Sequence, residues 1–247
     1  MEKEKLVIIP TFNESENIED IIQAVMALEG NFDLLIIDDN SPDGTSLRVK
    51  CLQNVYPERL HLIIREGKNG LGTAYLEGFQ YAIAHCYEYI FEMDADFSHN
   101  PQDLIRLYKA CALEGYDLAI GSRYITGVNV VNWPMTRVLM SFFASKYVQF
   151  ITGMPIKDAT AGFKCYKVQV LKNIRLEKIK FVGYAFQIEM KFKTWKLGFK
   201  IKEVPIIFTD RTKGTSKMST KIFKEAVFGV IQMKIRSWFF KYKPNQT

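Results

Sequence analysis

Short apolar runs alternate with helix-like segments through the first half of this chain, and this alternation restricts its fold more than any other feature. We expect strands at 6–9, 34–37, 60–64, 89–93 and 118–120, and helices at 15–28, 45–54, 73–85 and 101–113. Apolar strands separated by helices are typical of a parallel sheet that is covered on both faces. In such a sheet, ligands bind at the carboxyl ends of the strands.

The pattern changes after residue 113. We expect a largely apolar helix at 135–151, another helix at 184–197, a strand at 200–208, a flexible loop at 209–219 and a final helix at about 220–241. The sequence therefore predicts an α/β domain, with a mostly parallel central sheet flanked by helices, over residues 1–219. An amphipathic C-terminal segment, residues 220–247, would follow it.

Composition narrows the class of protein. Hydrophobic residues make up 48% of the 247 residues, which is enough for a large core without disulfides or metals as staples. The four cysteines include no Cys-x-x-Cys pair, which argues against zinc and favours a reducing compartment. The N-terminus lacks the apolar region of a signal peptide, and no uncharged apolar stretch reaches about 18 residues. We expect neither export nor a membrane span.

Two aspartates one residue apart, Asp94 and Asp96, follow the expected strand at 89–93. Carboxylates that leave a strand together can turn toward one point, and their oxygens suit Mg²⁺ or Mn²⁺. A divalent ion held by one or two carboxylates is a common means of gripping the phosphates of a nucleotide. Because an Asp-x-Asp triplet also arises by chance on many loops, the interpretation depends on the other strand ends.

A basic segment centred on a glycine, residues 210–217, offers matching phosphate contacts. Arg211 and Lys217 could reach a diphosphate, and Gly214 would let the loop fold over it. The alternative is a solvated basic loop. The net charge of +6, with many lysines and arginines in residues 191–243, indicates an anionic partner, whether phosphate, lipid or nucleic acid.

Other strand ends also carry polar or glycine-rich residues. Asp38 and Asp39 follow the second expected strand, where an acid could accept hydrogen bonds from a base or a ribose. The segment from Arg65 to Gly72 could cradle phosphate or simply turn, and its glycines match neither a dinucleotide fingerprint nor a P-loop.

A third cluster combines Arg123, after the fifth expected strand, with Arg137 and Ser141, which share one face of an expected helix. These three could bind a second anion such as an acceptor phosphate, or they could be unrelated surface residues. The sequence has no Gly-x-Ser-x-Gly segment and no recognisable cysteine–histidine pair, so we expect no covalent nucleophile.

Four segments, in order, resemble the polyprenol-phosphate (dolichol-phosphate) mannosyltransferases of glycosyltransferase family 2, which have the GT-A fold. The segments are Val7 to Glu14, Ile37 to Thr45, Met93 to His99 and Asp210 to Ser219. The resemblance implies transfer of mannose from GDP-mannose to a membrane polyprenyl phosphate, with inversion at the anomeric carbon. It also implies Mg²⁺ or Mn²⁺ as the cofactor.

The resemblance assigns roles to individual residues by position. The residues implied are Pro10, Phe12, Glu14 and Asp39 for the guanosine; Asp94 and Asp96 for the metal; Arg211 and Lys217 for the donor diphosphate; and Arg123, Arg137 and Ser141 for the acceptor phosphate or the sugar.

The chain departs from the family pattern at three places. Phe12 replaces the usual tyrosine and keeps only its stacking face. Ser98 stands where some members have a glutamine metal ligand, so we expect Ser98 beside Asp94 and Asp96 at the metal, although the substitution leaves the identity of the third ligand open. Residues 158–164, which end in Lys164, vary a segment that often reads Ser-Gly-Phe-Arg, and this weakens any anion-binding role for that lysine.

A polyprenyl phosphate lies in a bilayer, and the last expected helix offers a contact with it. Its apolar face would combine Phe223, Val227, Val230, Ile231, Trp238 and Phe239, with lysines and an arginine around them. This is the composition of an interfacial helix, and the alternative is a helix packed on the domain. We expect a peripheral protein on the cytoplasmic face of the membrane, with room for a membrane-anchoring partner protein.

Other interpretations stay open at this point. The donor could be UDP-glucose or a UDP-N-acetylhexosamine. The chain could also be a non-catalytic nucleotide-binding module, or a nucleic-acid binder whose tail interleaves aromatic residues with lysines. Because the acidic strand ends would repel a polyanion, we expect no nucleic-acid partner.

Overall fold

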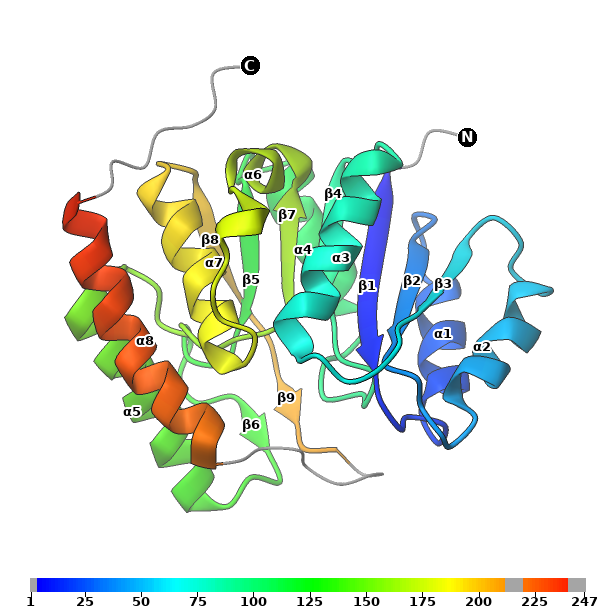
Figure 1. Cartoon of the computed structure of the whole chain (residues 1–247), viewed down its shortest axis with the longest axis horizontal. Helices are drawn as coiled ribbons and strands as arrows, with labels where there is room; N and C mark the ends of the chain where they lie inside the picture. Colours follow the sequence, from blue (N-terminus) through cyan, green and yellow to red (C-terminus); the bar gives the residue numbers. More distant parts are fainter. Residues whose placement is uncertain (1–3, 212–219, 240–247) are drawn as a thin grey trace.

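The computed structural model describes residues 4–211 and 220–239. A seven-stranded sheet in the order β3-β2-β1-β4-β7-β5-β8 forms its centre (Figure 1). Its strands are β1 (Lys5–Thr11), β2 (Asp33–Asp38), β3 (Leu60–Ile64), β4 (Tyr89–Glu92), β5 (Leu118–Ser122), β7 (Lys164–Lys167) and β8 (Ile201–Pro205). All neighbouring strands are parallel except β7, which is antiparallel to both β4 and β5. The predicted α/β class with a mostly parallel sheet is confirmed.

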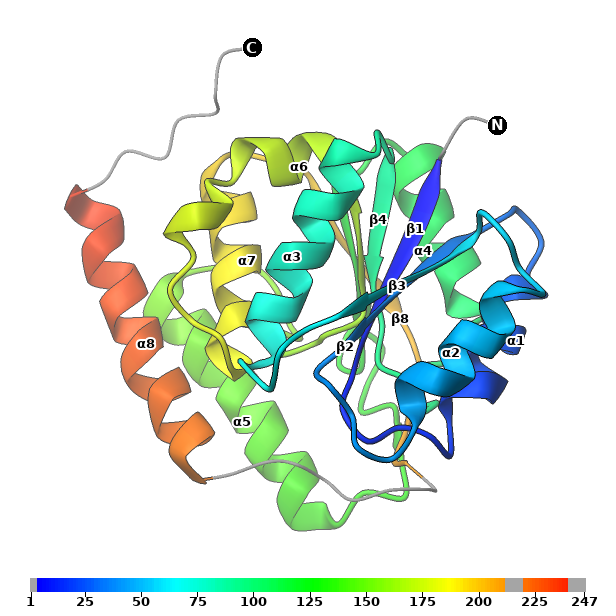
Figure 2. The same cartoon turned by 45° about the vertical axis from the view of Figure 1, so that its right-hand side comes forward.

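Helices cover both faces of the sheet because successive strand residues point to opposite sides. Leu6 and Ile8 of β1 belong to one core, whereas Val7 and Ile9 belong to the other. The first core takes side chains from α3 (Leu71–Ala84), α5 (Met135–Thr152), α6 (Val168–Asn173), α7 (Tyr184–Lys196) and α8 (Thr220–Phe239), and the second from α1 (Ile18–Met26), α2 (Thr45–Gln53) and α4 (Asp103–Ala112). Figure 2 shows α3 and α7 side by side on the first face.

Helix α3 lies unusually close to the sheet at Gly78. A Cβ atom there would come 2.7 Å from Ile8 Cγ2 and 3.1 Å from Ile37 Cδ1, which is closer than carbon atoms pack. The glycine therefore allows the close approach of α3 to strands β1 and β2.

The antiparallel strand β7 was not predicted. Its first residue, Lys164, is fully buried, and its amine lies 3.0 Å from Glu92 Oε1 of β4 and also contacts Gln187 of α7. Gln187 Nε2 in turn donates to Glu92 Oε2 at 2.8 Å. A lysine in a four-residue strand looks like a loop residue in the sequence, and here the buried charge of Lys164 is compensated by Glu92.

The expected single strand at 200–208 is wrong. Strand β8 ends at Pro205, and the chain then forms β9 (Phe208–Thr209), which pairs in parallel with β6 (Val130–Val131) in a separate two-stranded sheet. Proline has no N–H to continue the ladder, so the strand stops there. The short helix α6 and the 3-10 helix η1 (Leu176–Lys178) were not predicted either.

The three later helices, α5, α7 and α8, lie where the sequence places them. Helix α8 packs against both α5 and α7, and α5 and α8 run side by side at the edge of the molecule (Figure 1). The division of the chain at residue 219 stays a prediction. Among the helices in the described part of the chain, none is both long enough and apolar enough to cross a bilayer.

Candidate active site at the carboxyl ends of the strands

The loops after β1 and β2 are fastened to each other by the first of the two adjacent aspartates. Asp38 is fully buried and accepts hydrogen bonds from Thr11 Oγ1 at 2.8 Å and from Ser41 Oγ at 2.6 Å. The backbone N–H of Asp39 donates to the Thr11 carbonyl at 3.0 Å. Asp38 therefore has a structural role, and the loop leaves Asp39 as the acid that faces the strand ends.

Asp39 is paired with Arg65, a partner that the sequence did not predict. Its Oδ1 lies 2.6 Å from Arg65 Nε, and the same guanidinium donates to Thr73 Oγ1 at 2.7 Å. Burial raises the pKa of Asp39 above its ordinary value, although the charge of Arg65 opposes this shift. In the segment from Arg65 to Gly72 the arginine positions Asp39, and a phosphate-binding role for this segment stays a prediction.

The predicted guanosine residues after β1 line the same edge of the sheet. Pro10 and Phe12 are half-buried, and the amine of Lys68 lies 4.6 Å from the centre of the Phe12 ring. Glu14 accepts a hydrogen bond from Asn17 Nδ2 at 3.0 Å. Pro10 thus lies near the end of β1, Phe12 and Glu14 on the loop after it, and Asp39 on the loop after β2. Their contact with a nucleoside stays a prediction.

The two aspartates after β4 differ in exposure. The side chain of Asp94 is 42% exposed, whereas that of Asp96 is 6% exposed. Asp96 Oδ1 accepts hydrogen bonds from the N–H of Ser98 at 3.1 Å and from its hydroxyl at 2.6 Å, and Asp96 Oδ2 lies 2.8 Å from Arg211. In this structure Ser98 orients Asp96, and its role as a metal ligand stays a prediction.

Burial and repulsion from Asp96 raise the pKa of Asp94. Desolvation by the surrounding chain, followed by the charge of Asp96, raises the pKa of Asp94 to about 7, although the tip of its side chain reaches water. Beside them His99 packs against the Phe163 ring at a centroid distance of 4.8 Å, and burial lowers its pKa to about 4. A site with this excess of negative charge favours a cation.

The donor set fits a divalent ion that shares its coordination with a ligand. Among residues 4–211 and 220–239, no three His, Cys, Asp or Glu side chains converge on one point, so a closed all-protein cage is absent there. Mg²⁺ and Mn²⁺ are commonly bound by one or two carboxylates together with phosphate oxygens and water. Asp94 and Asp96 would supply the carboxylates.

Arg123 is held in place by Asp158, which lies 35 residues further along the chain. Its Nε donates to Asp158 Oδ2 at 2.7 Å and its Nη2 to Asp158 Oδ1 at 2.6 Å, while its backbone N–H also donates to Oδ2. Despite complete burial, which alone would raise it, the pKa of Asp158 is lowered because the Arg123 charge and these hydrogen bonds outweigh the desolvation.

A tryptophan joins the two predicted acceptor arginines. The guanidinium of Arg137 lies 4.1 Å from the Trp133 ring centre and that of Arg123 lies 5.4 Å from it. Arg137 Nη1 also contacts Asp210 Oδ1 at 2.8 Å, next to Arg211. Ser141 is half-buried on α5, one turn beyond Arg137. The structure thus brings Arg123, Arg137 and the start of the basic segment together.

The second phosphate-binding residue expected from that segment, Lys217, lies outside the described residues. The sequence assigned no role in the site to Trp133, which contacts both acceptor arginines. Arg65, Asp158 and Asp210 lie within segments named above, but only three-dimensional proximity shows the ion pairs that they form.

Comparisons with known proteins agree with this architecture. The family model described as glycosyl transferase family 2 matches residues 6–175. A polyprenol monophosphomannose synthase from Mycolicibacterium smegmatis is 44% identical over 231 residues, which are 94% of this chain and 87% of that protein. An undecaprenyl-phosphate mannosyltransferase from Micrococcus luteus is 41% identical over 225 residues, 91% of each protein.

Solved structures show the same fold at low sequence identity. The glucosyl-3-phosphoglycerate synthase of Mycobacterium tuberculosis, in complex with Mn²⁺, UDP and glucosyl-3-phosphoglycerate, superimposes with a TM-score of 0.70 at 16% identity, covering 94% of this chain and 80% of that one. A mannosyltransferase from Pyrobaculum calidifontis in complex with GDP-Man and Mn²⁺ superimposes with a TM-score of 0.57 at 14% identity, covering 92% of this chain and 69% of that one. The expected GT-A fold is confirmed, and the chain belongs to glycosyl transferase family 2.

Proposed function

We propose that this protein transfers mannose from GDP-mannose to a polyprenyl phosphate with inversion at the anomeric carbon. The observation that carries the proposal is the pair Asp94 and Asp96 after β4, with Asp96 Oδ2 2.8 Å from Arg211 and the loops of Phe12 and Asp39 beside it. The names of the two relatives at 44% and 41% identity support mannose as the sugar and a polyprenyl phosphate as the acceptor.

The acceptor chemistry needs little from the protein beyond alignment. A phosphate monoester is already ionised near neutral pH, so its oxygen can attack the anomeric carbon without a general base. The bond from that carbon to the diphosphate oxygen breaks, and GDP departs with the electron pair. In this proposal Arg123 and Arg137, which flank Trp133, hold the acceptor phosphate in line with that bond.

Charge on the departing diphosphate is the main barrier that the site must lower. A divalent cation on Asp94 and Asp96, Mg²⁺ or Mn²⁺, would neutralise part of that charge. Arg211 pairs with Asp96 in this structure, and in this proposal it would contact an oxygen of the donor diphosphate. Phe12 would offer a stacking face to guanine, and Asp39 an acceptor to the base or ribose.

A donor and acceptor screen tests this function. Radiolabelled GDP-mannose, UDP-glucose and UDP-N-acetylglucosamine would each be incubated with a short polyprenyl phosphate and Mg²⁺ or Mn²⁺, then extracted into organic solvent. We expect label in the lipid only from GDP-mannose, and little transfer by Asp96→Asn with an unchanged circular dichroism spectrum. The matched control is Asp20→Asn on α1, which should transfer normally. Label from a UDP-sugar would contradict the proposed donor.

Helices α5 and α8 support a peripheral position on the membrane. Together they expose large apolar side chains on one edge of the molecule: Met135, Leu139, Met140, Phe143 and Phe150 on α5, and Phe228, Ile231, Ile235, Trp238 and Phe239 on α8. Exposure reaches 61% at Phe143 and 70% at Trp238. Such a surface with nearby basic residues suits an anionic bilayer, and we propose that it faces the cytoplasmic leaflet.

The expected apolar face of α8 is only partly exposed. Val230 is buried in the core, so α8 both packs on the domain and exposes an apolar stripe, while the side chain of Phe223 lies outside the described residues. Flotation with anionic liposomes tests the membrane contact. We expect Phe143→Ser combined with Trp238→Ser to abolish flotation, and the matched control Leu113→Ser, on an exposed residue away from this edge, to retain it. A wild-type protein that does not float at low salt would contradict direct docking and would indicate a membrane-anchoring partner protein.

A further inference from the structure

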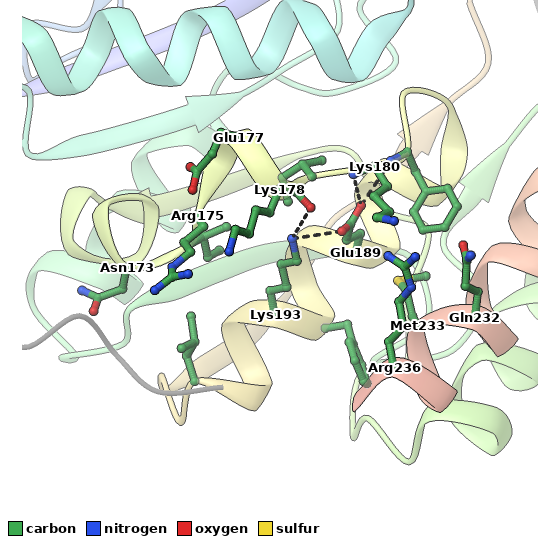
Figure 3. A pocket seen from close by; sticks show the side chains of 15 residues that line it. Asn173, Arg175, Glu177, Lys178, Lys180, Glu189, Lys193, Gln232, Met233 and Arg236 are labelled. Carbon is green, nitrogen blue, oxygen red and sulfur yellow. Dashed lines mark hydrogen bonds and ion pairs between the residues drawn. The ribbon is translucent and has the colours of Figure 1, made fainter. Parts of the chain in front are cut away.

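A cavity lies away from the proposed donor and acceptor residues. It has a volume of about 800 Å³ and is enclosed by α7, α8 and the segment 173–181, which connects α6 to α7 (Figure 3). This volume is within the range of sites that bind small organic ligands. None of the residues proposed for the nucleotide, the metal or the acceptor phosphate lines it.

The floor of the cavity is apolar. Ile174, Phe192 and Met233 are buried beneath it, and Phe181 and Leu197 form half-buried walls. An alkyl chain is the natural occupant of such a floor, because burying it removes apolar surface from water on both partners.

The rim of the cavity is cationic. Five basic side chains and two acidic ones line it, and the basic residues come from three elements: Arg175, Lys178 and Lys180 from the connecting segment, Lys193 from α7 and Arg236 from α8. Figure 3 shows these side chains around the opening.

Only one of these cations is neutralised within the described chain. Glu189 Oε1 lies 3.0 Å from Lys193 Nζ, and Glu189 Oε2 accepts the backbone N–H groups of Lys180 and Phe181 at 3.0 and 3.2 Å. The other four basic side chains form no ion pair with a residue of 4–211 or 220–239, and neither does Glu177. An anion is therefore the charge complement of the rim.

Helix α8 presents the cavity and the proposed membrane surface on adjoining faces. Gln232, Met233 and Arg236 line the cavity, whereas Ile231 and Ile235 belong to the exposed apolar stripe. At about 100° per residue, the centres of the two faces are separated by about a third of a turn. A lipid in a bilayer beneath the stripe would thus have its headgroup next to the rim.

We propose that this cavity binds an anionic phospholipid, with the headgroup phosphate at the cationic rim and part of an acyl chain on the apolar floor. The bound lipid would hold α8 against α7 and the connecting segment. The proposal rests on the membrane association proposed above, and the site is separate from that of the polyprenyl phosphate at Arg123 and Arg137. The chain's own last residues, 240–247, suit the rim poorly because they add two further lysines.

Binding of monomeric lipid to the purified full chain tests the proposal without needing a bilayer or sugar transfer. The probe is dihexanoyl phosphatidylglycerol below its micellar concentration, titrated by calorimetry, with dihexanoyl phosphatidylcholine as the zwitterionic comparison. We expect saturable binding of the anionic lipid only, and at least about a tenfold weaker affinity in Arg175→Gln combined with Arg236→Gln, since charge-assisted hydrogen bonds are lost. The matched control, Lys50→Gln on α2, should bind like the wild type.

Three results would overturn the proposal. These are equal binding of the choline lipid, unchanged affinity in the double variant, and equally tight binding of inorganic phosphate, which would show a small-anion site. Sugar-transfer kinetics separate this site from the proposed function: the double variant should keep the KM for the short polyprenyl phosphate. A raised acceptor KM with an unchanged donor KM would assign the cavity to the acceptor instead. A wild-type protein that binds the anionic lipid but does not transfer mannose would count against the proposed function alone.

Discussion

Replacing Asp158 by asparagine removes the acid that holds Arg123. Both side chains are nearly inaccessible, with 0% of the Asp158 side chain and 9% of the Arg123 side chain exposed. Asp158 accepts three hydrogen bonds from Arg123, two from its guanidinium and one from its backbone. Asp158→Asn keeps the size of the side chain, but it loses the negative charge and one of the two acceptor oxygens.

The expected cost follows from the arginine that is left behind. Removing one partner of a buried ion pair typically costs about 3–5 kcal/mol, because the remaining charge stays buried without compensation. Since asparagine retains one acceptor, we expect the lower end, about 3 kcal/mol. For a domain of this size, about 2–4 °C of melting temperature is lost per kcal/mol, so the melting temperature should fall by about 6–12 °C.

Urea and thermal unfolding at pH 7, followed by circular dichroism, measure this change. The matched control is Glu19→Gln, which removes an exposed ion pair with Arg48 and should cost less than about 1 kcal/mol. In the double variant R123M/D158N the unpaired charge is gone, so the loss should be smaller than in Asp158→Asn alone. A loss below about 1 kcal/mol in Asp158→Asn would refute the reasoning that this pair is a desolvated support of the site.

Two further predictions concern packing and pH. Gly78→Ala should destabilise the fold by about 1–3 kcal/mol in urea unfolding, because the new methyl group would lie 2.7 Å from Ile8. The control Gly67→Ala, where no atom lies within 4 Å, should change stability by less than about 0.5 kcal/mol. Equal losses of stability in the two variants would contradict the packing argument. Burial alone would raise the pKa of Asp43, but hydrogen bonds from Thr45 and Ser15 outweigh it and lower this pKa to about 2 from an ordinary 3.8. The lowered pKa stabilises the folded state above about pH 4, and this contribution disappears as the pH falls toward 2. Thermal unfolding of Asp43→Asn from pH 5 to 2 should therefore show a weaker pH dependence than the wild type, and an identical dependence would show that these hydrogen bonds do not favour the ionised acid.

The sequence predicts those parts of the fold whose cause is local. Strands β1 to β5 each contain an apolar run, and helices α1 and α4 have a clear apolar face, so these elements could be placed without knowing their neighbours. Strand β7 could not, since it depends on the distant Glu92 to accommodate the buried Lys164. The break at Pro205 had a local signal, a proline, which the apolar run around it concealed.

The same distinction holds for the site. Asp94 and Asp96 are adjacent in the sequence to the strand that delivers them, so their proximity could be predicted. The partners of the arginines could not, because Asp158 lies 35 residues from Arg123, and the Asp210 that contacts Arg137 is 73 residues away. No sequence periodicity links residues that meet only through the order of strands in a sheet.

Titration of GDP into the protein with and without Mn²⁺ tests the central claim most directly, namely that Asp94 and Asp96 hold a cation that binds the diphosphate. The wild type should bind GDP tightly only when Mn²⁺ is present, and Asp96→Asn should lose this enhancement while its circular dichroism stays unchanged. Equal GDP affinity in the wild type with and without Mn²⁺, or an undiminished Mn²⁺ effect in Asp96→Asn, would contradict the account.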